Sequence, residues 1–60
     1  MTRIRILLVD DHQVVRIGLQ ALLGVEQDFE VVGQAATADA AIALAERLQP
    51  QIVLMDVRLP

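Results

Sequence analysis

The sequence contains no cysteine, tryptophan or tyrosine and only one phenylalanine among its 60 residues. Without cysteine, no disulfide bond can stabilise the fold, and the composition is compatible with a reducing compartment. A chain of this length can form at most one small domain, and the hydrophobic core of such a domain is marginal. Stability must therefore come from packing of aliphatic side chains.

Long hydrophobic runs are also missing, although 55% of the residues are hydrophobic. No run approaches the ~20 residues that cross a bilayer. The apolar run after the basic segment Met1–Arg5 ends at Asp10 and is too short for a signal peptide. The net charge of −3 argues against a nucleic-acid-binding surface. These features predict a cytoplasmic protein with no membrane partner.

Three short apolar segments alternate with two helical patterns. We predict strands over Ile4–Val9, Phe29–Ala35 and Ile52–Asp56. One helix is predicted to begin near His12 or Gln13 and to end at Gly24, and the other to span Ala38–Leu48 after a Thr37 cap. The order β-α-β-α-β predicts an α/β fold with a parallel sheet and right-handed crossovers.

The patterns also predict which faces are buried. The third apolar run predicts a strand buried on both faces. Polar alternation in Phe29–Ala35 predicts an edge strand, with Phe29, Val31 and Gly33 on one side. In the first helix, helical spacing predicts one apolar stripe, with Gln13, Arg16 and Gln20 elsewhere on the helix. That stripe comprises Val15, Gly18, Leu19, Leu22 and Leu23.

Carboxylates follow two of the predicted strands. Asp10 and Asp11 come directly after Ile4–Val9, and Asp56 ends the third strand. If the first strand lies between the other two, in the order 2-1-3, the two helices cover opposite faces of the sheet. The first and third strands then flank a topological switch point, where open α/β sheets bind their ligands. We therefore expect the three acids to meet at one edge of the sheet.

Neighbouring carboxylates repel one another, and this favours either a retained proton or a bound cation. Oxygen ligands favour Mg²⁺, and a carboxylate beside Mg²⁺ can form an aspartyl phosphate. Each acid also has a purely structural interpretation. Asp11 can be a helix N-cap, Asp10 can end a strand, and Asp56 can be a turn residue. His12 is predicted to be a surface or helix-start residue.

Several segments resemble the receiver domain of bacterial two-component response regulators. The Asp-Asp-His start and the Val-Val-Gly strand are similar to the NarL/FixJ subgroup, whose members usually carry a C-terminal LuxR-type helix-turn-helix. The segments that carry the resemblance are Leu7–His12, Val15–Leu19 with Leu22 and Leu23, Val31–Ala35 and Pro50–Pro60.

The resemblance implies a flavodoxin-like, doubly wound parallel sheet in three layers and a signalling role rather than an enzymatic one. It implies that Asp56 is the phosphoacceptor, which takes a phosphoryl group from a histidine kinase or a small phosphodonor. Asp10, Asp11 and Asp56 would hold Mg²⁺, and the main-chain carbonyl of Arg58 would complete the metal site.

A receiver normally has five strands and five helices, in the sheet order 2-1-3-4-5. The resemblance implies that residues 1–60 are the N-terminal part of one such domain. The Ser/Thr after the fourth strand, the Lys after the fifth and a DNA-binding domain for transcription regulation would lie outside this sequence. The 60 residues alone would then be poorly phosphorylated. An open strand edge and open helix faces predict a homo-oligomer.

Two other functions remain as alternatives at this stage. The first is a self-associating structural fragment without chemistry, and a Mg²⁺ titration with Asp56→Asn as control would separate it from a phosphoacceptor. The second is a phosphohydrolase or nucleotide-binding α/β domain. Against the second, neither a Gly-x-Gly-x-x-Gly pattern nor a Walker A pattern follows the first strand.

Overall fold

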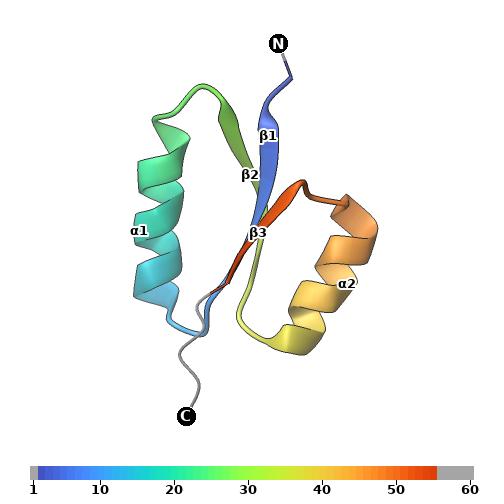
Figure 1. Ribbon diagram of the computed structural model, residues 1–60. Helices are drawn as coiled ribbons and strands as arrows, with labels where there is room; N and C mark the ends of the chain where they lie inside the picture. Colours follow the sequence, from blue (N-terminus) through green and yellow to red (C-terminus); the bar gives the residue numbers. More distant parts are fainter. Residues whose placement is uncertain (1, 56–60) are drawn as a thin grey trace.

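Three parallel strands form a sheet between two helices, one on each face (Figure 1). The computed structural model describes residues 2–55, so Asp56 and Arg58 lie outside the described residues. The elements follow the predicted β-α-β-α-β order, and the strand order β2-β1-β3 confirms the predicted 2-1-3 arrangement. Over residues 2–55, neither helix has the length and hydropathy needed to cross a membrane. The elements are β1 (Ile4–Val9), α1 (Gln13–Gly24), β2 (Phe29–Ala35), α2 (Ala38–Leu48) and β3 (Ile52–Met55).

The core is built on β1, the central strand. Ile6, Leu7 and Leu8 are at most 2% exposed. Leu7 packs with Val9, Ala35 and Ala41 on the side of α2, whereas Ile6 and Leu8 point to the opposite face because side chains alternate along a strand. The apolar run Ile6–Val9 suits β1 because these residues are buried and the strand is paired on both edges.

β3 pairs with β1 in parallel, from Ile6 opposite Ile52 to Val9 opposite Met55. Its residues are 38–54% exposed, so the predicted burial on both faces is wrong for the described part of the strand. The reason is its position at the edge of the sheet: α1 packs chiefly over β2, and α2 over β1 and β2. An apolar run therefore does not by itself establish that a strand is covered.

β2 is an edge strand, as predicted, but its alternation is interrupted. Val31 pairs with Ile6 while Gly33 pairs with Leu7, so Val32 is an extra residue in a β-bulge. Because paired residues of parallel strands point to the same side, Val31 and Gly33 lie on opposite faces. The predicted shared side for these two residues is therefore wrong.

α1 begins at Gln13 and ends at Gly24, in agreement with the prediction. Its half-buried side chains are Arg16, Leu19 and Leu23, whereas Leu22 is 69% exposed. The predicted apolar stripe is thus correct for Leu19 and Leu23 and wrong for Val15 and Leu22, and Arg16 lies on the side toward the sheet. The cause is that α1 leans on β2, where Arg16 finds polar partners.

α2 begins after the predicted Thr37 cap and ends at Leu48, as predicted. The Thr37 hydroxyl accepts a hydrogen bond from the Ala40 N–H at 3.1 Å, which satisfies one of the free donors of the first turn. At the other end Gln49 adopts a left-handed conformation, with φ of 48°, and its N–H donates to the Ala45 carbonyl. Pro50 follows and cannot continue the helix. Ala41 packs into the core because its small side chain permits close approach of α2 to the sheet.

Gly33 lies under α2, and substitution there is expected to destabilise the fold. A Cβ atom at this position would lie 2.9 Å from Leu48 Cδ1 and 3.3 Å from Leu7 Cδ1. Because both leucines would have to shift, Gly33→Ala should lower the free energy of unfolding by about 1–3 kcal/mol. A Cβ at Gly18, inside α1, meets nothing within 4 Å, so Gly18→Ala should raise it by about 0.5–1 kcal/mol. Urea unfolding followed by circular dichroism measures both, and equal stability of the two variants would contradict the packing described.

Candidate functional site

Asp10 and Asp11 lie at the carboxyl edge of the sheet, directly after β1. The Asp10 N–H donates to the Ala35 carbonyl of β2 at 3.0 Å, so β2 fixes the main chain of Asp10 as it leaves the strand. The Asp10 side chain is buried, whereas the Asp11 side chain is 75% exposed. The Asp10 carboxylate is thus enclosed by the protein, and the Asp11 carboxylate beside it is exposed to solvent.

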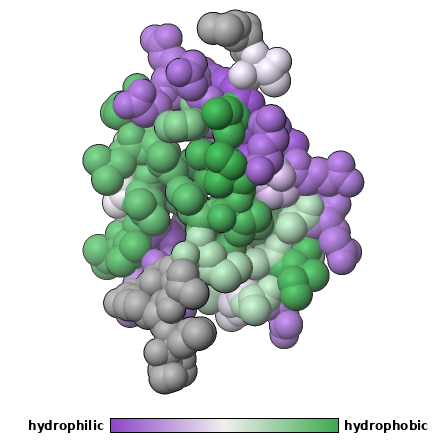
Figure 2. Space-filling view, in the orientation of Figure 1, coloured by the Kyte–Doolittle hydropathy of each residue, from purple (hydrophilic) through white to green (hydrophobic). Residues whose placement is uncertain are grey.

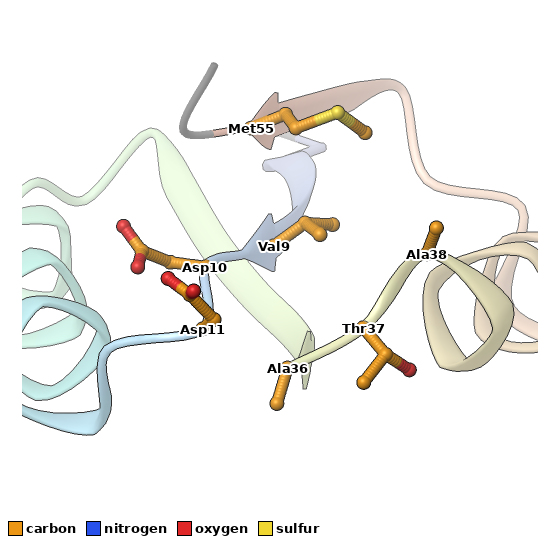
Figure 3. Close-up of a pocket in the computed structure, with 7 residues that line it drawn as sticks. All are labelled: Val9, Asp10, Asp11, Ala36, Thr37, Ala38 and Met55. Atoms are coloured by element: carbon orange, nitrogen blue, oxygen red, sulfur yellow. The ribbon is translucent and has the colours of Figure 1, made fainter. Parts of the chain in front are cut away.

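A pocket of about 190 Å³ adjoins the two acids (Figure 3). Its walls come from the end of β1, the segment between β2 and α2, the first residue of α2 and the end of β3. Ala36 and Ala38 contribute only small side chains, so the pocket leaves room for a small polar ligand. The lining residues are Val9, Asp10, Asp11, Ala36, Thr37, Ala38 and Met55.

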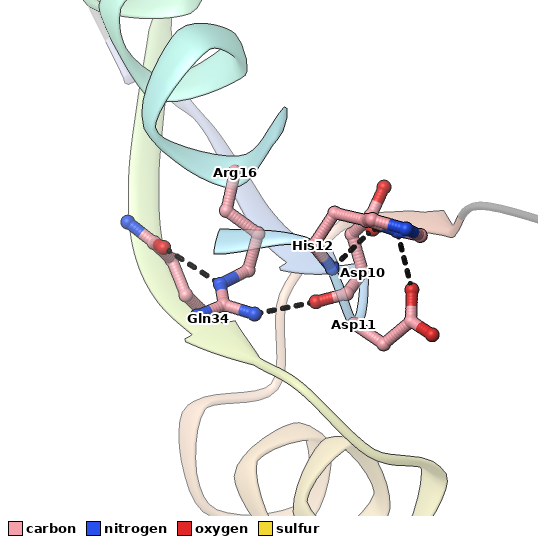
Figure 4. Close-up of polar contacts among 5 residues, drawn as sticks. All are labelled: Asp10, Asp11, His12, Arg16 and Gln34. Carbon is pink, nitrogen blue, oxygen red and sulfur yellow. Dashed lines mark hydrogen bonds and ion pairs between the residues drawn. The ribbon is translucent and has the colours of Figure 1, made fainter. Parts of the chain in front are cut away.

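The imidazole of His12 lies between the two carboxylates (Figure 4). Its Nδ1 atom is 2.7 Å from Asp11 Oδ1 and 3.2 Å from Asp10 Oδ1, and the His12 N–H donates to the same Asp10 oxygen at 2.7 Å. The N-cap position of α1 belongs to His12. The alternative in which Asp11 caps the helix is therefore wrong, because Asp11 pairs with the imidazole instead.

His12 begins the helix, as predicted, but its contacts with both acids were not anticipated. Carboxylate oxygens of Asp10 and Asp11 and a ring nitrogen of His12 all lie within 4.8 Å of one another. Two carboxylates this close repel each other, and a cation would relieve the repulsion. The arrangement is a candidate cation site whose oxygen donors suit a hard divalent ion.

Arg16 is a second residue whose place at the site was not predicted. Its Nη1 donates to the main-chain carbonyl of Asp10 at 2.5 Å, and its Nε donates to Gln34 Oε1 at 3.2 Å (Figure 4). Gln34 Nε2 in turn donates to Gln20 Oε1. A signal for this contact was present in the sequence: Arg16 stands one turn into α1, and long helical side chains lean back toward the helix N-terminus.

The described residues therefore unite two of the predicted site residues, Asp10 and Asp11, and add His12 and Arg16 to them. The predicted roles of Asp56 and Arg58 fall outside the described residues. The last described residue of β3, Met55, lies beside Val9 in the sheet and lines the same pocket as the acids.

Comparison with known proteins agrees with this architecture. A sequence model of the response regulator receiver domain family matches residues 6–60. The chain is also 48% identical over 54 residues to the response regulator protein VraR of Staphylococcus aureus, in strains Mu3, NCTC 8325 and COL alike. That alignment covers 90% of this chain but only 26% of VraR, so the chain spans about a quarter of the length of these relatives. Since the family match extends over nearly the whole sequence and the sheet has the expected strand order, the chain belongs to the response regulator receiver domain family, a family of signalling domains.

Proposed function

We propose that this chain is the phosphoacceptor part of a response regulator, in which Asp56 accepts a phosphoryl group from a histidine kinase. One observation carries the proposal: Val9 and Met55 are paired in register at the ends of β1 and β3. Asp10 follows Val9 in the sequence and Asp56 follows Met55. Since neighbouring strands lie about 4.8 Å apart, this register supports a site shared by acids from both strands.

The donor groups fit Mg²⁺ as the cofactor. Asp10, Asp11 and Asp56 would hold it with carboxylate oxygens, and Arg58 with its main-chain carbonyl. When bound, Mg²⁺ would compensate the negative charge of the phosphoryl oxygens. The pocket walls at Ala36 and Ala38 leave space there for a tetrahedral group.

The reaction would be a simple displacement at phosphorus. A carboxylate oxygen of Asp56 attacks the phosphorus of a phosphohistidine in the kinase, a P–O bond forms, and the P–N bond to the histidine breaks. The products are an acyl phosphate on Asp56 and an unmodified kinase histidine, which takes up a proton. The function is thus phosphorelay signal transduction.

In the longer protein that we infer, residues 1–60 form the N-terminal part of one receiver domain in the cytoplasm. Phosphorylation would control a C-terminal helix-turn-helix and thereby transcription, so DNA would be a partner only through that domain. The similarity to VraR, a response regulator protein four times as long as the matched region, supports this organisation.

Acetyl phosphate provides the test of phosphoacceptor function. We expect the 60-residue chain, incubated with acetyl phosphate and Mg²⁺, to gain one phosphoryl group slowly, on the peptide that contains Asp56. Asp56→Asn should abolish the gain, because an amide cannot form the acyl phosphate. The matched control is Asp28→Asn, at an exposed loop position, and it should label normally. Labelling of Asp56→Asn at the rate of the unsubstituted chain would contradict the proposal.

Self-association is a second candidate function, and the exposure of β3 favours it. Among residues 2–55, the outer edge of β3 pairs with no further strand. The segment Ile52–Met55 contains no charge and no proline, the features that usually block edge pairing. Apolar side chains also gather over α1 and β3 on the face shown in Figure 2.

An apolar groove of about 370 Å³ between α2 and β3 extends this surface. We infer that a second copy of the chain covers the groove. Each copy offers both the open edge of β3 and an apolar face that can pack against the same groove of its partner. The groove is lined by Leu7, Ala38, Ala41, Ile42, Ala45, Val53 and Met55.

A lysine in the groove should therefore disrupt the oligomer. Val53→Lys places a charge against the apolar wall of the groove, and burial of an unpaired charge is costly. We expect size-exclusion chromatography with light scattering to show an oligomer for the unsubstituted chain at micromolar concentration and a monomer for Val53→Lys. Val25→Lys makes the same change after the end of α1, at a residue that is 77% exposed and does not line the groove, and should leave the oligomer intact. A folded, monomeric unsubstituted chain would reject self-association.

A further inference from the structure

We propose that Arg16 is a positioning residue for the acidic site, and that Gln34 and Gln20 hold it in place. It fixes the peptide group on which Asp10 and Asp11 stand, and thereby raises the affinity of the site for a divalent cation. The inference rests on the proposed function, because it assigns the work of Arg16 to the cation site at these two acids.

The hydrogen bond from Arg16 is made to the main-chain carbonyl of Asp10, the group that leads on to Asp11. The Asp10 carbonyl accepts from Arg16 Nη1 at 2.5 Å, and the Asp10 N–H donates to Ala35 of β2. The main chain of Asp10 is thus held on one side by β2 and on the other by α1. Because a peptide group is planar, fixing this carbonyl also fixes the direction in which the chain continues to Asp11.

Arg16 is itself held by a chain of amides. Its Nε donates to Gln34 Oε1 at 3.2 Å, and Gln34 Nε2 donates to Gln20 Oε1, one turn further along α1. The guanidinium is planar and presents its N–H groups in a rigid fork. Two acceptors, one at the end of β1 and one on β2, therefore fix both its position and its plane. The network connects α1 and β2 to the strand end that bears the acids (Figure 4).

Because Arg16 is positively charged, the sign of the change in cation affinity on its removal tests its role. Among residues 2–55 its hydrogen bonds go to a main-chain carbonyl and an amide, so it holds the main chain of Asp10 through neutral acceptors. A cation in the first turns of a helix also opposes the helix dipole. As a nearby positive charge alone, Arg16 would weaken cation binding by repulsion. As a positioning residue it strengthens cation binding. Removal of Arg16 would therefore raise the cation affinity if only its charge mattered and lower it if its positioning role dominates.

The experiment measures Mg²⁺ affinity by isothermal titration calorimetry for the unsubstituted chain and four variants. Arg16→Gln should bind about tenfold more weakly, as is typical when a group that orients a ligand is removed. Arg16→Lys should be intermediate, because an ammonium group can reach one acceptor but lacks the fork. Gln34→Leu removes a support without changing the charge and should also weaken binding. The control Arg3→Gln makes the same charge change before the start of β1, at the opposite end of the strand from Asp10, and should not weaken binding.

A second readout needs no metal. The carbonyl ¹³C shift of Asp10 and the amide ¹⁵N shift of Asp11 should move in Arg16→Gln and return partly in Arg16→Lys, while both stay unchanged in Arg3→Gln. A general loss of structure would instead move signals throughout the sheet. If Arg16→Gln does not fold, Arg16→Lys and Gln34→Leu carry the test, and unchanged affinity in both overturns the inference.

The outcomes separate this inference from the proposed function. If the unsubstituted chain binds Mg²⁺ and Arg16→Gln binds it as tightly as Arg3→Gln or more tightly, the inference is overturned and the proposed function stands. If the unsubstituted chain binds no Mg²⁺, both are overturned. Weaker binding together with the two local shift changes supports the inference.

Discussion

Replacement of Asp10 by asparagine is expected to remove most of the Mg²⁺ affinity while leaving the fold intact. Asn can keep the acceptor oxygen that receives the His12 N–H at 2.7 Å, so the turn into α1 should persist. It cannot supply the charged oxygen that a divalent cation prefers. Because loss of an outer-shell partner already costs about 10–100-fold in metal affinity, the loss of Asp10 itself should reach or exceed that range.

The same substitution should not destabilise the chain in the absence of metal. Asp10 is buried beside Asp11, and removal of one of two neighbouring negative charges relieves their repulsion. We therefore expect an unchanged or higher urea midpoint for Asp10→Asn together with the loss of Mg²⁺ binding in calorimetry. The matched control is Asp28→Asn, which should change neither. Mg²⁺ binding by Asp10→Asn within twofold of the unsubstituted chain would show that Asp10 is not a ligand.

The second large effect concerns stability and falls on Leu7. This side chain is fully buried and packs with Ala35 and Ala41 under α2. Leu→Ala substitutions at such sites cost about 2–5 kcal/mol. A domain of this size has only about 3–9 kcal/mol of stability in total, so Leu7→Ala should leave much of the chain unfolded at room temperature.

Leu22→Ala provides the matched comparison because Leu22 of α1 is 69% exposed. Its effect should stay within about 0.5 kcal/mol. Urea unfolding monitored by circular dichroism measures both variants. Similar midpoints for Leu7→Ala and Leu22→Ala would be incompatible with a core centred on β1.

Local signals in the sequence were sufficient to predict the elements and their order. Thr37 and the Gln49–Pro50 pair bound α2 by local chemistry alone, and the structure confirms both ends. The strand order 2-1-3 came from the resemblance to receiver domains, and the polar alternation of Phe29–Ala35 agreed with an edge position for that strand. The position of Asp10 and Asp11 at the carboxyl edge then followed from topology.

Features that depend on distant partners were not predictable in the same way. The bulge at Val32 is a mismatch in residue count between β1 and β2, which no local pattern encodes. The exposure of β3 depends on which elements cover it, not on the composition of Ile52–Met55. Arg16 faces the sheet because Gln34 and the Asp10 carbonyl offer it acceptors, a pairing that only the assembled fold reveals.

The account depends above all on one claim: acids from the ends of both β1 and β3 share a single cation. Nuclear magnetic resonance of the ¹⁵N-labelled chain with traces of Mn²⁺, which accepts the same oxygen ligands as Mg²⁺, tests it directly. We predict that paramagnetic broadening first removes the amide signals of Asp10, Asp11 and Asp56 together, that excess Mg²⁺ restores them, and that Asp10→Asn prevents the effect. Broadening at Asp10 and Asp11 that spares Asp56, or broadening spread over exposed acids such as Glu46, would contradict the shared site.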